Sequence, residues 1–235
     1  MPSVTELAEL RSIYGDPHDL AVKKSLTRLD RHCREFLRLS PFLMISSEGP
    51  NGADISPRGD PPGFVGIEDE QTLLIPDRPG NNRIDTLENI LHNPRVGLIF
   101  LVPGLGEALR INGLAEIVTG PELDTLAMNG RAPKTALRVR VREVFFHCAK
   151  ALIRSKLWEP ESRVAKGAFP PLGIVVADQI AGVEAGDAEG PRRRLQVRPL
   201  LRQGSARAAI AVPSQRPWSA WKISASGFDS ESARI

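Results

Sequence analysis

The sequence predicts a fold that is mainly β with helices, in the α+β class. Between residues 42 and 147 it holds about six short apolar or alternating segments, separated by dense turn-forming sequences. Few helical patterns interrupt them, and residues 42–77 lack the strand–helix alternation of a doubly wound α/β fold. These observations favour a β-barrel with added helices.

The first 40 residues predict two helices before the sheet. Residues 3–14 form an amphipathic pattern, in which Ser3 and Glu6 have capping-box spacing and Gly15 follows. A second helix is expected over residues 20–39 and should end before Pro41, because the residue before a proline resists the helical conformation.

The remaining elements follow from local patterns. An irregular edge strand is expected where Pro57 interrupts the strand pattern, and a bulge is expected at Asn112-Gly113. The most apolar strand, 95–104, is expected to be buried on both faces. The expected strands are 42–47, 53–59, 64–67, 72–77, 95–104, 108–118 and 136–148, and the expected helices are 82–92, 121–130 and 147–158.

The last part of the chain differs in composition. Residues 191–235 hold nine Lys and Arg against two acids. Periodicity is lost from about residue 184, which predicts a disordered basic tail over residues 183–235, or a segment translated from a shifted reading frame. The predicted organisation is N-terminal helices over 1–40, a domain over 41–182 and the tail over 183–235.

Composition narrows the class of protein. A net charge of +3 over 235 residues gives no reason to expect a nucleic-acid partner. Two cysteines are typical of a reducing compartment. We see neither a secretory leader nor an apolar run of roughly 18 residues, so a cytoplasmic protein that does not enter the membrane is expected.

The segment RPGNNR, residues 78–83, precedes a predicted helix and is a candidate phosphate site. A helix N-terminus favours anions, and guanidinium groups bind phosphate through paired hydrogen bonds. The alternative is an ordinary capped turn, with Asn82 as the N-cap, Asp85 as its partner and solvated arginines. The candidate ligands are Arg78, Asn81, Asn82 and Arg83, and the expected buried helix face is Ile84, Leu87, Ile90 and Leu91.

Other cations lie on strands or on a predicted helix face. Arg58 follows a proline on the irregular strand, and Arg110 lies opposite its apolar neighbours on strand 108–118. Spacings of 3, 4 and 4 place four further residues on one helical face, suited to an anionic aromatic ligand or simply to solvent. These four residues are His147, Lys150, Arg154 and Trp158.

Motifs for protein-based chemistry are missing from the sequence. It has no phosphate-binding P-loop, dinucleotide-binding glycine motif or nucleophile elbow, and its four histidines and two cysteines lack metal-ligand spacing. Any chemistry is therefore expected to come from a bound cofactor.

Residues 30–182 resemble the pyridoxamine 5′-phosphate oxidase superfamily of FMN-binding split β-barrels. The most specific part is GNNRIDTLENILHNPRVGLIF, in which a phosphate turn and a helix precede an apolar strand. The resemblance is strongest to a branch of FMN-dependent, general-stress-type proteins whose substrates are uncharacterised. It implies a homodimer with FMN at the interface, in contact with both chains.

The resemblance also implies roles for individual residues. Arg58 is similar to a strand arginine that contacts the flavin ribityl or phosphate, and Asn82 and Arg83 to residues that bind the phosphate. Arg110 resembles a basic residue near the cofactor. The segment 143–158 takes the place of a partner-subunit Trp and Arg, although its motif differs.

The resemblance to the oxidase itself is incomplete. After Arg58 this chain has Gly-Asp-Pro-Pro where the oxidase has a lysine-containing strand, and the C-terminal substrate signature is not evident. The expectation is an FMN-dependent oxidoreductase with an unknown small-molecule substrate. The alternative is a non-catalytic module that binds flavin, haem or deazaflavin.

Overall fold

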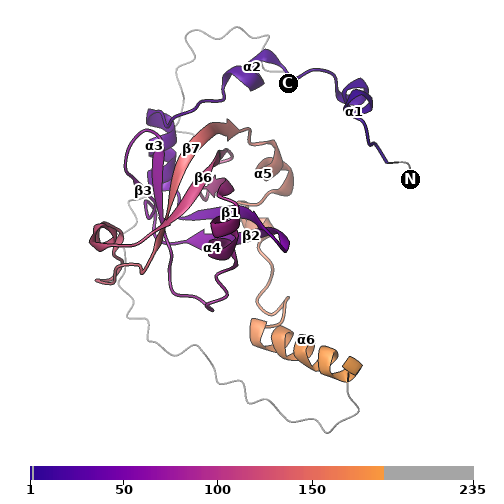
Figure 1. The fold of residues 1–235 in the computed structure, drawn as a ribbon. Coiled ribbons are helices and arrows are strands. Elements are labelled where there is room, and N and C mark those ends of the chain that lie inside the picture. Colours follow the sequence, from indigo (N-terminus) through magenta and orange to yellow (C-terminus); the bar gives the residue numbers. More distant parts are fainter. Residues whose placement is uncertain (2, 188–235) are drawn as a thin grey trace. The chain divides into compact units, whose positions relative to one another are not determined.

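A computed structural model describes residue 1 and residues 3–187 of the chain (Figure 1). The chain divides into two units, Met1–Ala165 and a second unit that begins at Lys166. The first unit contains the sheet. The second contains helix α6 (Leu172–Asp187).

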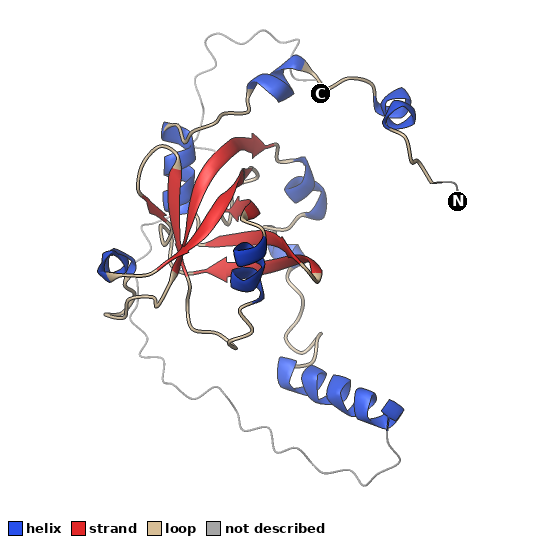
Figure 2. Cartoon of the chain, viewed as in Figure 1, coloured by secondary structure: helices blue, strands red, loops and turns tan. Residues whose placement is uncertain are grey.

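The first unit is built on one seven-stranded sheet in which every neighbouring pair is antiparallel (Figure 2). Its spatial order is β2-β1-β5-β6-β7-β4-β3. The strands are β1 (Phe42–Gly49), β2 (Gly52–Gly59), β3 (Gly66–Ile67), β4 (Thr72–Pro76), β5 (Arg95–Leu101), β6 (Ala108–Val118) and β7 (Ala136–His147). The sheet and its helices confirm the predicted α+β split-barrel class.

The helices of this unit do not alternate regularly with the strands of the sheet. One of them, α4 (Asp85–His92), packs against β1, β2 and β6. The others in this unit are α1 (Leu7–Tyr14), α2 (Asp19–Lys23), α3 (Arg31–Leu39) and α5 (Lys150–Ser155), with the 3₁₀ turns η1 (Pro121–Leu126) and η2 (Pro160–Ser162).

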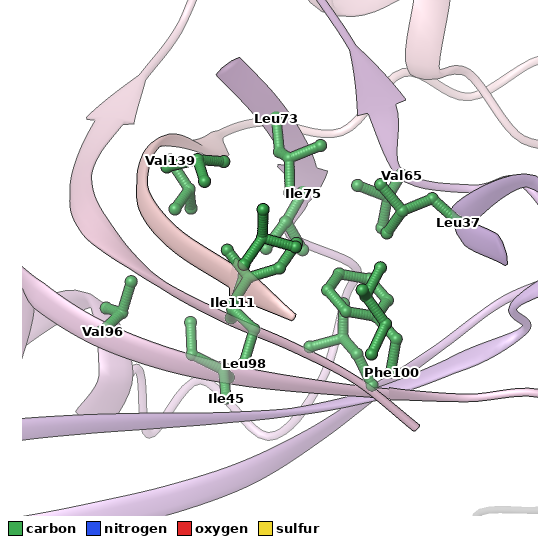
Figure 3. Close-up of a cluster of buried hydrophobic side chains, with 14 of the residues drawn as sticks. Leu37, Ile45, Val65, Leu73, Ile75, Val96, Leu98, Phe100, Ile111 and Val139 are labelled. Atoms are coloured by element: carbon green, nitrogen blue, oxygen red, sulfur yellow. The ribbon is translucent and has the colours of Figure 1, made fainter. Parts of the chain in front are cut away.

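The core lies on one face of the curved sheet. Residues of alternate positions from β1, β5 and β6 point into it, as a two-residue strand period requires. Figure 3 shows labelled side chains such as Ile45, Phe100 and Ile111 pointing toward one another. Each such aliphatic or aromatic side chain contributes about 1.5–3 kcal/mol when fully buried.

Several strand predictions are confirmed. The strand containing Pro57 is β2, which among the described strands pairs with β1 alone and forms an edge of the sheet, where a missing N–H is tolerated. The β6–β7 register shifts between Asn112 and Gly113, as the predicted bulge requires. In β7, Leu137, Val139 and Val141 are all buried.

The N-terminal helices differ from the prediction. Residues 20–39 are not one helix, because Leu26 leaves the helix to bridge Val144 of β7, and Asp30 starts α3 by accepting a hydrogen bond from Cys33 N at 2.8 Å. The predicted Ser3 cap is also wrong, since α1 has Glu6 at its N-cap and no side-chain cap.

Two other elements are corrected by tertiary contacts. Strand β5 is not buried on both faces, since buried and half-buried residues alternate along it. The predicted helix 147–158 shrinks to α5, because β7 continues through His147 in its pairing with β6.

No helix within the described residues combines the length and apolarity that a membrane crossing requires. Helix α6 reaches Asp187, and the rest of the predicted tail, 188–235, lies outside the described residues.

Candidate functional site

A cavity of about 480 Å³ lies between the edge strand β2 and the N-terminus of α4. Five of the ten residues predicted from the sequence line it: Arg58, Arg78, Asn81, Asn82 and Arg83. The rest of the lining comes from β2, the last residue of β4, the β4–α4 loop, the first turn of α4, Phe64 and Lys134. The candidate phosphate turn and the candidate strand arginine therefore face one space.

Strand β2 presents alternate polar residues to this cavity. Asp54, Ser56 and Arg58 are half-buried lining residues, whereas the intervening Ile55 is 66% exposed. This division follows from the two-residue period of a strand. The edge strand therefore places a carboxylate, a hydroxyl and a guanidinium on one wall.

A directional hydrogen-bond chain connects that wall to α4. Arg58 Nη1 donates to Ser56 Oγ at 2.9 Å, and Thr86 Oγ1 donates to Asp54 Oδ2 at 3.2 Å. The two hydroxyls are 2.8 Å apart. Because Thr86 has given its only proton to Asp54, Ser56 donates to Thr86. Thr86 is only 4% exposed, so the chain fixes the Arg58 side chain against a buried hydroxyl.

The loop before α4 has an unusual backbone. Asn82 (φ 61°) and Ile84 (φ 53°) both adopt left-handed conformations. Asparagine tolerates this region, but it is strained for a β-branched residue. Strain of this kind clusters at binding sites, where surrounding structure holds the backbone in place.

The predicted cap and buried face of this helix are therefore corrected. Ile84, not Asn82, occupies the N-cap, with no side-chain cap, and the Asp85 carboxylate binds Arg83 at 2.9 Å. Ile84 and Leu91 are 50% and 76% exposed. The buried residues are Thr86 and Ile90, with Leu87 packed partly against the core.

The start of α4 leaves backbone donors available. Asn81 Oδ1 accepts from Arg83 N at 3.1 Å, and Ile84 O accepts from Leu87 N at 2.8 Å. The N–H groups of Asp85 and Thr86 have no hydrogen-bond acceptor among the described residues. Free N–H groups at the positive end of a helix dipole favour an anion.

Arg78 lines the cavity but has a structural partner. Its Nε lies 2.6 Å from Asp60 Oδ2, and its Nη2 donates to Leu126 O at 2.9 Å. The guanidinium therefore joins the β4–α4 loop to the segment after β2 and to η1. If Arg78 bound a phosphate, as predicted, that interaction would compete with its bonds to Asp60 and Leu126.

The other five predicted residues, Arg110, His147, Lys150, Arg154 and Trp158, do not line this cavity. The guanidinium of Arg110 lies 5.3 Å from the Phe145 ring centre, and Lys24 lies 5.4 Å from the same ring. Burial and these two cations lower the pKa of His147.

The predicted helical face of four residues is wrong. His147 ends β7, and Lys150 and Arg154 belong to α5. Trp158 follows the left-handed C-cap Lys156, and its Nε1 donates to Leu105 O at 2.7 Å. The indole therefore holds the segment after α5 against the β5–β6 loop.

Sequence reasoning missed five polar residues of the cavity, namely Asp54, Ser56, Asp77, Thr86 and Lys134. Asp54 and Ser56 carried a signal, since they lie four and two residues before Arg58 on one strand face. Lys134 carried none, because it precedes β7, about fifty positions after the phosphate turn.

A second hollow of about 630 Å³ lies along α3. Its lining includes Arg31, Arg34 and Arg38 together with Glu35 and Glu70. None of the ten predicted site residues lines it. Within residues 1 and 3–187, no group of three or more His, Cys, Asp or Glu side chains is placed to hold a metal ion.

Comparison with solved structures found distant similarity. HupZ from Group A Streptococcus is 18% identical, with 50% of this chain and 93% of that chain covered and a TM-score of 0.42. A Clostridium acetobutylicum protein related to general stress protein 26 (pyridoxinephosphate oxidase family) is 17% identical, with 50% and 86% covered and a TM-score of 0.39. No curated protein matched.

The sequence profile of one family matches a continuous segment of this chain. The family is described as pyridoxamine 5′-phosphate oxidase, and the match spans residues 29–148, just over half of the 235 residues. That segment runs from the start of α3 to the end of β7 and contains the whole sheet and the lining of the cavity. The chain therefore belongs to the pyridoxamine 5′-phosphate oxidase family.

Proposed function

We propose that the protein is an FMN-binding oxidoreductase that acts on an unidentified small molecule. The observation that supports this most is the cavity, in which β2, the strained loop and the α4 N-terminus converge within the segment matched to the family. FMN would supply the redox chemistry, and the protein would supply binding and electrostatics.

The donors in the cavity fit a phosphate monoester. The N–H groups of Asp85 and Thr86 at the helix start have no acceptor within residues 1 and 3–187, and Arg58, Arg83 and Lys134 surround the same space. Backbone N–H groups and cations are the groups that bind phosphate in other helix-terminus sites. Arg58 is already oriented by Ser56, so little side-chain freedom would be lost when it binds.

The proposal is tested by the absorbance of the purified protein and by thermal unfolding with FMN. A bound flavin gives a yellow protein, and a ligand that binds only the folded state must raise the unfolding temperature. A colourless protein whose unfolding temperature does not respond to FMN contradicts the proposal.

Catalysis is tested separately from binding. Reduction of the bound flavin by NADH or NADPH, followed by turnover with an added acceptor, would support an oxidoreductase. A flavin that binds tightly and is not turned over would favour the non-catalytic module, for which haem and a deazaflavin are further ligands to titrate.

A homodimer with the cofactor at its interface is part of the proposal. Half-buried residues on the sheet face away from the core lie in one register across four strands: Met44, Ile99, Arg110 and Phe145. A partly apolar row of this kind suits contact with a second copy. Sedimentation velocity at micromolar concentration tests it, and a monomer would contradict it.

We further propose a cytoplasmic location. Both cysteines are free, which is typical of a protein in a reducing compartment. Cys33 is buried in the core, and Cys148 is exposed. Burial is the main cause that raises the pKa of Cys33 to about 12, so this thiol is held in its unreactive form. Fractionation of cells that produce the protein would test the location.

A further inference from the structure

Four cationic side chains line the cavity, and two of them already have carboxylate partners. Arg78 lies 2.6 Å from Asp60, and both side chains are mostly buried. Arg83 binds Asp85 through Nε and Nη2, each at 2.9 Å. An anionic ligand that recruits either residue must compete with an ion pair.

Arg58 is partly committed as well. Its Nη1 donates to both Ser56 Oγ and Pro57 O at 2.9 Å. These bonds use one nitrogen of the guanidinium and leave its other N–H groups for a ligand. Arg58 is thus held at a fixed place on the wall of the cavity.

Lys134 differs from these arginines. Within the described part of the chain its ammonium has no carboxylate or hydrogen-bond partner, and its side chain is exposed. The backbone beside it is anchored, since Pro133 is buried and Thr135 O accepts from Asp77 N at 3.0 Å. An exposed ammonium without a protein partner among the described residues therefore lines the cavity opposite the β4–α4 loop, on an anchored backbone.

Charge balance explains why this cation matters. Asp54, Asp77 and Asp85 also line the cavity, so the negative charge of these carboxylates offsets most of the positive charge of the arginines there. An anion entering this space gains most from a cation that is not already neutralised. A lysine can turn its three donors toward a ligand phosphate without breaking a protein bond.

We propose that Lys134 recognises the anionic group of the ligand, and so makes the site select a phosphorylated flavin over the neutral one. This inference rests on the proposed function. It assigns the selective contact to a residue outside the phosphate turn, on the segment that leads into β7.

The test compares FMN with riboflavin, which lacks the phosphate, by quenching of flavin fluorescence. Lys134→Gln should weaken FMN binding about tenfold, since a charge-assisted hydrogen bond is lost, and should leave riboflavin binding unchanged. Lys134→Arg should retain most of the preference. Lys23→Gln, at an exposed lysine of α2, is the matched control and should bind both ligands as the wild type does.

The outcomes separate the inference from the proposed function. Equal FMN affinities for the wild type and Lys134→Gln, with FMN still preferred over riboflavin, overturn the inference alone. Equal losses for FMN and riboflavin overturn it too, because they indicate a change of fold. A wild-type protein without saturable FMN binding overturns the proposed function and the inference together.

Discussion

Arg78 and Asp60 form a nearly buried ion pair, with Nε and Oδ2 2.6 Å apart and side chains 23% and 15% exposed. The pair connects the loop before α4 to the segment after the edge strand. Because Arg78 also donates to Leu126 O, one guanidinium joins three parts of the chain around the cavity. The residue that the sequence offered as a phosphate ligand thus shapes the cavity wall.

Replacing Arg78 is expected to destabilise the fold. Arg78→Met removes the partner of a mostly buried carboxylate and should lower the free energy of unfolding by about 3 kcal/mol. Urea denaturation measures this loss. Asp60→Asn combined with Arg78→Met should lose less than the sum of the single changes, because the two residues interact.

Arg83→Met is the matched control for that prediction. Its ion pair with Asp85 is exposed, since the Arg83 and Asp85 side chains are 74% and 44% exposed. Loss of this pair should therefore lower the free energy of unfolding by no more than about 1 kcal/mol. Equal destabilisation by the Arg78 and Arg83 variants would contradict the structural role of Arg78.

Thr86→Val should break the hydrogen-bond chain between β2 and α4. Valine matches the shape of threonine but leaves Ser56 and Asp54 without their shared partner, which should cost about 1–3 kcal/mol in the free energy of unfolding. Thr125→Val is the control, since this exposed hydroxyl donates to Glu122 O in its own turn and has no other partner in the described part of the chain. A loss no larger than that of the control would argue against the chain.

Ile84→Asn should raise the unfolding temperature. Asparagine tolerates the left-handed backbone at this position, and the relief of strain should contribute about 1 kcal/mol. Leu91→Asn, at an exposed helical position with an ordinary backbone, should give no gain. A lower melting temperature for Ile84→Asn would show that the isoleucine side chain contributes more than its backbone strain costs.

Stability should depend on pH through His147. Burial, followed by the charges of Arg110 and Lys24, lowers the pKa of His147 below its ordinary value of 6.5. The unfolded chain then binds more protons than the folded protein, so this stability is present above pH 6.5 and is lost as the pH falls through the lowered folded pKa. Urea denaturation between pH 8 and 5 should show the loss, and His147→Gln should reduce it.

The sequence by itself determined the α+β class, the edge strand at Pro57, the bulge at Asn112-Gly113 and the existence of a polar turn before α4. These features follow from local physics, namely the two-residue strand period, the missing N–H of proline and the turn preference of Gly and Asn. The alternation of Asp54, Ser56 and Arg58 was visible there as well.

Tertiary structure alone decided which residues share the cavity and which cations are free. The pairing of Leu26 with Val144 ended the predicted long helix, and the pairing of β7 with β6 kept His147 in a strand. The partners of Arg78 and the placement of Lys134 depend on segments 18 to about 50 residues away from the phosphate turn. Helical and strand periods report only which local face a residue occupies, so contacts over such separations were fixed by the packing of the sheet.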